Sequence, residues 1–309
     1  MSALGQAAAE YLALRRQLGY KLEAHGPLLA QFVAFLDARG ETVITTPLAL
    51  AWATEPAGAT PAWWRQRLAV VRGFARHRQA FDARTEVPTI DLLPGKFRRA
   101  IPYLYSEAEI QRLMAAAARM FRSPLKAATY ETLIGLLSVT GMRVGEAIAL
   151  DRADVELGAH RLTIRRAKGG RSREIPLHPS TVAALDTYAR MRDERQPHPT
   201  DPSFLLSTAG TRLRYPNVWN AFDRLRDASG LDRETLGRQA RIHDVRHAFV
   251  LNTLLGWYRD QEDVEAKLPL LATFLGHVDP ASTYWYFEGA PQLLALAAQR
   301  LERTWKEPS

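Results

Sequence analysis

Two tyrosines near the C-terminus carry hydroxyl groups that could act as nucleophiles. Tyr284 and Tyr286 stand two residues apart in the stretch from Leu275 to Gly289, after a Gly-His pair and a turn. A tyrosine hydroxyl can attack phosphorus and form a phosphotyrosine ester, which keeps the energy of the broken bond for resealing. Ser282 is an N-cap candidate, and on a helix the two tyrosines would lie about 200° apart. Helix geometry therefore allows only one of them to face a given phosphate and does not decide which.

Other side chains suited to a phosphate occur in four separate stretches. They are Arg143 in TGMRVGE, Lys168 in a Gly-rich turn, His243 and Arg246 in HDVRH, and His277 in LGH. Arginine stays protonated and can bind phosphate with two parallel hydrogen bonds, and histidine can take up a proton near neutral pH. Each residue also has an ordinary interpretation taken singly, for example a salt bridge between Arg143 and Glu146.

The elements expected to carry these residues are mainly helices. A capping box, Ser106 to Glu109, predicts the start of one helix, and Thr46-Pro47 and Thr60-Pro61 each predict a cap followed by proline at the first helical position. The segments RLTIRR and SREIPL alternate on either side of a Gly pair, which predicts an antiparallel hairpin with Lys168 at its tip. The expected fold class is mainly α with a small antiparallel β-sheet in the C-terminal domain.

Periodicity and proline placement divide the chain into three parts. Residues 1–82 show helical spacing of apolar residues, whereas residues 83–103 lose this spacing and contain three prolines and a basic cluster. Residues 104–309 carry all four stretches described above. We therefore expect a helical domain, a basic linker and a larger second domain.

Composition favours a polyanionic partner. The chain has 309 residues, a formal net charge of +8 and a pI of about 9.9. It has no cysteine, which excludes disulfides, thiolate metal ligands and cysteine nucleophiles and suits a cytoplasmic protein. We expect no membrane span, because no long uncharged apolar run occurs, and no signal peptide, because Glu10, Arg15 and Arg16 interrupt the N-terminal segment.

Several basic residues could contact a phosphate backbone. Three share one helix face at intervals of seven and four, three lie in the linker, and two precede a helix in the second domain; a solvated helix face is the alternative for the first three. The candidates are Arg65, Arg72, Arg76, Lys96, Arg98, Arg99, Arg212 and Arg214.

As a set, the four stretches resemble the tyrosine recombinase (phage integrase) family. The matching features are TGMRVGE, a lysine in a hairpin, HDVRH, LGH, and a tyrosine nine residues after the LGH histidine, all in the family order. The resemblance covers about residues 103–300, and the preceding helical part resembles the family's core-binding domain in a two-domain clamp. IPLHPSTVAALD, STYWYF and YLALRRQLGYKLE also resemble recombinases encoded as adjacent trios in mobile elements.

The resemblance implies a role for each candidate. Arg143 and Arg246 would stabilise the charge of the transition state, and His243 and His277 would add hydrogen bonds to the same phosphate. One of these histidines would take the tyrosine proton, Lys168 would protonate the departing 5′ oxygen, and the family spacing selects Tyr286 as nucleophile. Glu146 would orient Arg143 or a histidine. His247 is either part of the site or a packing residue.

The activity implied is site-specific cutting and rejoining of DNA through a 3′-phosphotyrosyl intermediate. Partners implied are double-stranded DNA with inverted-repeat sites, further copies forming a tetramer on paired sites, and sister recombinases, with action at the nucleoid in the cytoplasm. No metal, ATP or other cofactor is expected, because no HExxH or phosphate-binding GxxxxGK[ST] loop occurs. A type IB topoisomerase and a catalytically silent DNA-binding relative remain alternatives.

Overall fold

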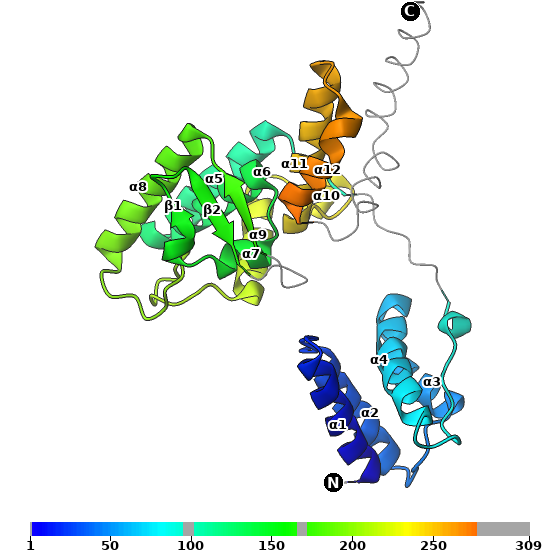
Figure 1. Cartoon of the computed structure of the whole chain (residues 1–309). Coiled ribbons are helices and arrows are strands. Elements are labelled where there is room, and N and C mark those ends of the chain that lie inside the picture. The colour runs from blue at the N-terminus through cyan, green and yellow to red at the C-terminus, as the bar shows by residue number, and fades with distance from the viewer. Residues whose placement is uncertain (1, 95–101, 166–171, 277–309) are drawn as a thin grey trace, which may run out of the picture. The chain divides into compact units, whose positions relative to one another are not determined.

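The computed structural model describes residues 2–94, 102–165 and 172–276 (Figure 1). The chain divides into two compact units, residues 1–100 and 101–309, and each is described by itself. Seven candidate residues from the sequence lie outside the described residues. They are Lys96, Arg98, Arg99, Lys168, His277, Tyr284 and Tyr286.

The first unit is a small bundle of helices around an aromatic core. Phe32, Trp52 and Phe74 are almost completely buried at its centre. The buried Arg67 lies over the Trp52 ring, 3.8 Å from its centroid, and donates a hydrogen bond of 2.7 Å to the Trp52 carbonyl. The helices are α1 (Ala3–Gln17), α2 (His25–Asp37), α3 (Thr46–Thr54) and α4 (Pro61–Gln79).

The sequence predicted an N-cap followed by proline for α3 and for α4, and the structure confirms only the cap of α4. Thr60 caps α4, and Pro61 follows at the first helical position, as predicted. The prediction for α3 was wrong by one residue, since Thr45 is the N-cap and Thr46 is already helical. Thr45 has the extended backbone of a cap and its hydroxyl accepts a hydrogen bond from the Leu48 N–H, whereas proline is tolerated at either of the first two helical positions.

Residues that follow α4 fold back onto the first unit. The Arg72 guanidinium donates hydrogen bonds of 2.7 Å to the carbonyls of Pro88 and Thr89, and the Glu86 carboxylate accepts one of 2.7 Å from the Thr46 N–H. Leu93 packs against the core of the unit, just after the short 3-10 helix Ile90–Leu92. The first part of the expected linker is therefore attached to the helical bundle.

The second unit packs helices around the long buried helix α6. The predicted capping box is confirmed at α5, where Ser106 and Glu109 bond each other's backbone N–H groups. The apolar residues of α6 form the centre of the core, against which α5, α8 and α11 pack. The helices are α5 (Glu107–Met120), α6 (Pro124–Thr140), α7 (Val144–Ala149), α8 (Pro179–Arg195), α9 (Tyr215–Ala228), α10 (Arg233–Leu236), α11 (Ile242–Arg259), α12 (Val264–Leu275) and the 3-10 helix Arg152–Asp154.

A three-stranded antiparallel sheet completes the second unit. Its strands are β1 (Val155–Glu156), β2 (Arg161–Ile164) and β3 (Arg173–Pro176), in the order β1-β2-β3. Strand β2 pairs with β3 so that Leu162 lies opposite Ile175, both fully buried. The predicted hairpin is confirmed, and with it the fold class: mainly helical with a small antiparallel sheet (Figure 1).

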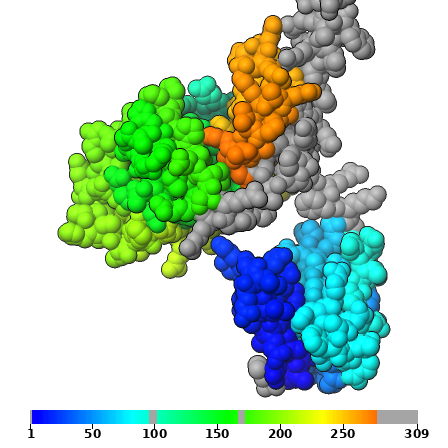
Figure 2. All heavy atoms as spheres, in the orientation of Figure 1, coloured from blue at the N-terminus to red at the C-terminus, as the bar shows by residue number. Residues whose placement is uncertain are grey.

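Helix α12 brings the end of the described chain back to the sheet. It packs against α11 through a separate apolar cluster that includes Leu254 and Leu271, and its last turns contact β3. Figure 2 shows this segment in orange against the green surface of residues around the sheet. No helix among the described residues is both long enough and apolar enough to cross a membrane.

Candidate functional site

Arg143 stands on a sharp turn between α6 and α7. Helix α6 ends at Thr140 and is capped by Gly141, which has a left-handed backbone with a φ of 58°. The turn also packs tightly, because a Cβ at this position would lie 2.3 Å from Cδ1 of the Phe249 ring on α11. Glycine meets both demands. Arg143 then takes the N-cap position of α7, with 28% of its side chain exposed.

The buried carboxylate of Glu146 binds two arginines at once. It accepts hydrogen bonds from the Arg143 backbone N–H at 3.0 Å and from the Arg143 Nη1 at 2.8 Å. On its other side it accepts bonds of 2.7 and 3.2 Å from the two Nη atoms of Arg173 on β3. Burial alone would raise the pKa of Glu146, but the hydrogen bonds from Arg173 and Arg143 lower it, so the carboxylate is charged.

Arg246 is buried at the junction of three helices. It lies on α11, whose first turn is held by hydrogen bonds from Arg241 to the buried Asp244. Its guanidinium donates to the Gly141 carbonyl at 2.7 Å and to the Leu275 carbonyl at 2.9 Å. Both carbonyls lie at helix C-termini, where backbone oxygens lack helical partners and a cation is favoured. Arg246 therefore joins α11 to the ends of α6 and α12.

Three arginines bind three consecutive carbonyls at the end of α12. Arg173 Nε donates to the Phe274 carbonyl at 2.8 Å, Arg246 Nη2 to that of Leu275 at 2.9 Å, and Arg143 Nη2 to that of Gly276 at 3.3 Å. Guanidinium groups from the turn before α7, from β3 and from α11 thus bind the end of α12. The predicted residues Arg143, Glu146 and Arg246 are brought together here.

His243 and His247 lie one turn apart on α11, with ring centroids 5.0 Å apart and nearly perpendicular planes. His243 is exposed as a residue, yet desolvation of its ring lowers its pKa and the Arg246 guanidinium lowers it further. Desolvation and the neighbouring His243 lower the pKa of His247 to about 4. Both histidines are therefore neutral at neutral pH, and a neutral imidazole can accept a proton.

The described basic candidates for DNA contact differ in their surroundings. Arg72 binds the carbonyls of residues 88 and 89, whereas Arg65 is half-buried and Arg76 is exposed on the same helix. Arg212 donates to Asp151 at 2.5 Å and lies 3.0 Å from Asp201, so it ties loops of the second unit together. Arg214 is exposed at the start of α9.

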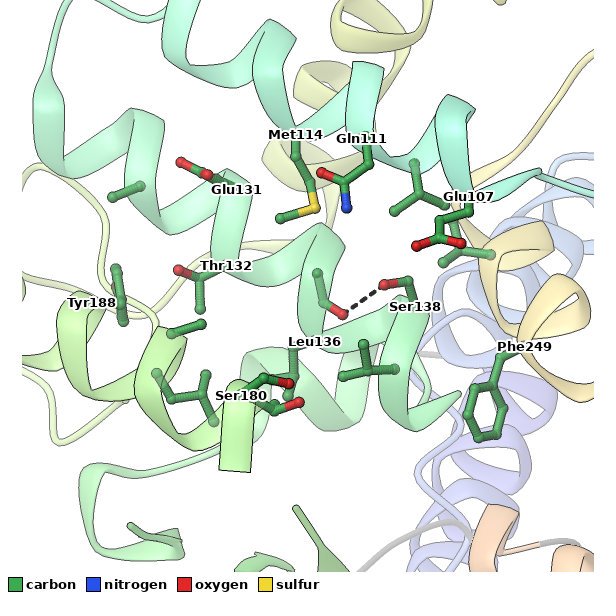
Figure 3. A pocket seen from close by; sticks show the side chains of 18 of the residues that line it. Glu107, Gln111, Met114, Glu131, Thr132, Leu136, Ser138, Ser180, Tyr188 and Phe249 are labelled. Carbon is green, nitrogen blue, oxygen red and sulfur yellow. Dashed lines mark hydrogen bonds between the residues drawn. The ribbon is translucent and has the colours of Figure 1, made fainter. Parts of the chain in front are cut away.

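A cavity of the second unit lies apart from the arginine cluster. It has a volume of about 650 Å³ and lies among α5, α6, α8 and α11. Its lining is mainly apolar, with Met114, Leu136 and Phe249 around the space and Glu107 and Gln111 at one side (Figure 3). None of the three arginines lines it.

The described residues also contain no group of three His, Asp or Glu side chains that could hold a metal ion.

Arg173 is the residue of this cluster that the sequence reasoning missed. The strand pattern contained a signal, because alternate residues of a strand share a face and Arg173 lies on the same face as the buried Ile175. A charged residue on the buried face of a strand needs a partner there. Here the partners are Glu146 and the Phe274 carbonyl.

Comparison with known proteins identifies the family. The phage integrase family model matches residues 104–292. A putative integrase/recombinase of Sinorhizobium fredii, y4rB, is 45% identical over 312 residues, with 99% of each chain covered.

Two solved structures share the fold. A Tn1549 transposon integrase in complex with a circular intermediate DNA has a TM-score of 0.67, 15% identity, and coverage of 96% of this chain and 99% of that one.

The second structure is XerH site-specific recombinase bound to palindromic difH substrate in a post-cleavage complex. Its TM-score is 0.64 at 20% identity, and the match covers 92% of this chain and 79% of that one. The family model matches more than half of the chain. The match to the putative integrase/recombinase y4rB covers 99% of both chains. The chain therefore belongs to the phage integrase family of tyrosine recombinases.

Proposed function

We propose that this recombinase cuts and rejoins DNA at specific sites through a 3′-phosphotyrosyl intermediate, with Tyr286 as the nucleophile. The observation that carries the proposal is the gathering of Arg143 and Arg246, with His243 on the same helix as Arg246, around the carboxyl end of α12. Guanidinium groups held in fixed positions stabilise the negative charge that develops on a phosphate under attack.

In the proposed cleavage step, the Tyr286 oxygen attacks phosphorus and the bond from phosphorus to the 5′ oxygen breaks. The phenol proton passes to a neutral histidine, for which His243 is the described candidate because its pKa is lowered. Lys168 gives the proton that completes the departing 5′ hydroxyl. Arg143 and Arg246 bind the non-bridging oxygens. Religation reverses these steps and restores the free tyrosine.

We assign DNA binding to both parts of the chain. In this proposal the helical part, residues 1–82, and the linker, residues 83–103, contact the backbone of a DNA site, and residues 104–309 carry the chemistry. Arg76 and Arg214 support this assignment because both are exposed. Two similar structures contain DNA, one of them a palindromic substrate. We extend the proposal to inverted-repeat sites, a tetramer on paired sites, sister recombinases, an origin in a mobile element and action of the protein at the nucleoid.

The deciding experiment is covalent capture on a nicked suicide substrate. The substrate carries the ends of the DNA element that encodes the chain, and the adduct is mapped by peptide sequencing. Wild type, Tyr286→Phe and Tyr284→Phe are compared. We expect an adduct on Tyr286 that disappears only with Tyr286→Phe.

Other outcomes separate the alternatives. Tight binding without an adduct, also in the presence of sister recombinases, contradicts catalysis and supports a silent DNA-binding protein. Relaxation of supercoiled DNA that lacks any such site supports a topoisomerase. An adduct that disappears with Tyr284→Phe and persists with Tyr286→Phe contradicts the choice of nucleophile.

A further inference from the structure

We propose that Arg173 is a positioning residue, which holds Glu146 and the end of α12 so that Arg143 keeps its positive charge available for the phosphate. The inference rests on the proposed function and adds to it a residue that is not among the candidates for contact with DNA. Arg173 is mostly buried, with 11% of its side chain exposed, compared with 28% for Arg143.

Arg173 determines the net charge of the group that it forms with Glu146 and Arg143. Glu146 is 8% exposed and its pKa is lowered, so it carries a full negative charge next to Arg143. The charges of Arg143 and Glu146 alone would sum to zero. Arg173 adds a second guanidinium on the same carboxylate, and the three groups together carry one net positive charge. A site that must stabilise the negative charge of a phosphate in the transition state needs this excess.

Arg173 also holds Glu146 and the end of α12 at short hydrogen-bond distances. Arg173 is the only one of the three arginines for which both Glu146 and the end of α12 accept hydrogen bonds at less than 3.0 Å, at 2.7 and 2.8 Å. Arg143 also contacts both, but its bond to the Gly276 carbonyl is 3.3 Å long. The strand that carries Arg173 is paired in a sheet, so its backbone is fixed. Arg173 thus sets the distance between the α7 turn and the α12 end, which the Arg143 side chain also bridges.

The test compares Arg173→Met and Arg173→Lys with wild type and with a control on the next strand. Arg161→Met is the control, because Arg161 also forms ion pairs, with Glu156 and Glu174, but lies outside the cluster. Single-turnover cleavage and DNA affinity are measured separately. We expect Arg173→Met to lower the cleavage rate about 100-fold, a loss like that of one preorganised donor, while the Kd for DNA stays within about twofold.

The conservative variant and a modified substrate test how the loss arises. Lysine keeps the charge but lacks the planar fork, so we expect Arg173→Lys to recover part of the rate, to about tenfold below wild type. A 5′-bridging phosphorothiolate has a leaving group that needs no proton donor. We expect it to restore cleavage by Lys168→Ala and not by Arg173→Met or Arg143→Met, since the last two act on the phosphate charge.

A second measurement does not depend on activity. Urea midpoints are compared for Arg143→Met, Arg173→Met and the double variant. Each single variant leaves Glu146 one guanidinium, and the double variant leaves it only the backbone N–H of residue 143. We therefore expect the midpoint of the double variant to fall by more than the sum of the two single shifts. Unchanged cleavage by Arg173→Met, full rescue by the phosphorothiolate or additive urea shifts would each overturn the inference. If wild type itself gives no adduct, the proposed function fails while the urea comparison still decides whether the arginines share Glu146.

Discussion

The guanidinium of Arg173 fills the space in which a side chain at position 276 would lie. A Cβ on Gly276 would be 2.6 Å from Arg173 Nη1 and 2.9 Å from its Cζ. The backbone of Gly276 also has a φ of 65°, where side chains are strained. The glycine of the LGH stretch is thus explained by the described structure alone, since it closes α12 and leaves room for an arginine that binds the last turn.

We predict that Gly276→Ala weakens both folding and cleavage. The left-handed backbone alone costs roughly 1–2 kcal/mol for alanine. Displacement of Arg173 adds the loss of its hydrogen bonds to Phe274 and Glu146. Gly237→Ala is the matched control, because Gly237 also caps a helix with a φ of 65° but a Cβ at this position would have nothing within 4 Å.

Urea unfolding and single-turnover cleavage of both variants check this prediction. We expect Gly237→Ala to show only the backbone cost and to cleave as wild type does. Equal destabilisation of the two variants, with equal activity, would show that Arg173 moves aside without consequence.

Gly141 and Phe249 form a second tight contact next to Arg143. A Cβ at position 141 would lie 2.3 Å from the Phe249 ring. We predict that Gly141→Ala destabilises the chain by about 3 kcal/mol, the sum of backbone strain and overpacking. Phe249→Ala should relieve the overpacking, so the double variant should be less destabilised than the two single changes added together. Additive urea midpoints would indicate that the ring rotates away freely.

The sequence predicted the elements of this site better than the contacts between them. The hairpin that carries Arg173 was predicted correctly, because alternation and a glycine pair are local signals. Arg173 was missed because its partners, Glu146 and Phe274, lie 27 and 101 residues away in the sequence. Such pairings depend on how α12 returns to the sheet, which local patterns do not encode. Arg72 was grouped with phosphate-binding residues for the same reason, although it also binds the carbonyls of residues 88 and 89.

His247 should make stability depend on pH in a defined range. Its pKa is about 4 in the folded chain and about 6.5 in an unfolded one, so the unfolded state binds the proton first. Stability is then fully present above about pH 6.5 and is lost as the pH falls towards 4, by on the order of 2–3 kcal/mol. His247→Gln should make the urea midpoint less dependent on pH over this range. His243, whose pKa is also lowered, should leave a smaller residual slope, and an unchanged slope would contradict the assignment.

The cleavage rate should also fall at acidic pH if His243 takes the tyrosine proton. Only the neutral ring can accept it, and the lowered pKa keeps the ring neutral below the usual value of about 6.5. We predict a single-turnover rate that stays constant to a pH below that value and then falls. His243→Ala should remove this acidic limb and lower the rate about 100-fold or more. A rate that falls with a pKa at or above 6.5 would assign the base to another group.

Arg72 and Arg76 lie on one face of α4 but should behave differently when replaced. Arg72 donates two charged hydrogen bonds to the carbonyls of residues 88 and 89, so Arg72→Ala should destabilise the chain by about 2–3 kcal/mol. Arg76 is exposed, and Arg76→Ala should leave stability within about 0.5 kcal/mol. If Arg76 contacts a phosphate, its loss should weaken binding to all DNA sequences equally and reduce the slope of log K against log salt by about 1. Urea unfolding and salt-dependent DNA titration of both variants separate these effects, and an unchanged salt slope for Arg76→Ala would remove this residue from the DNA interface.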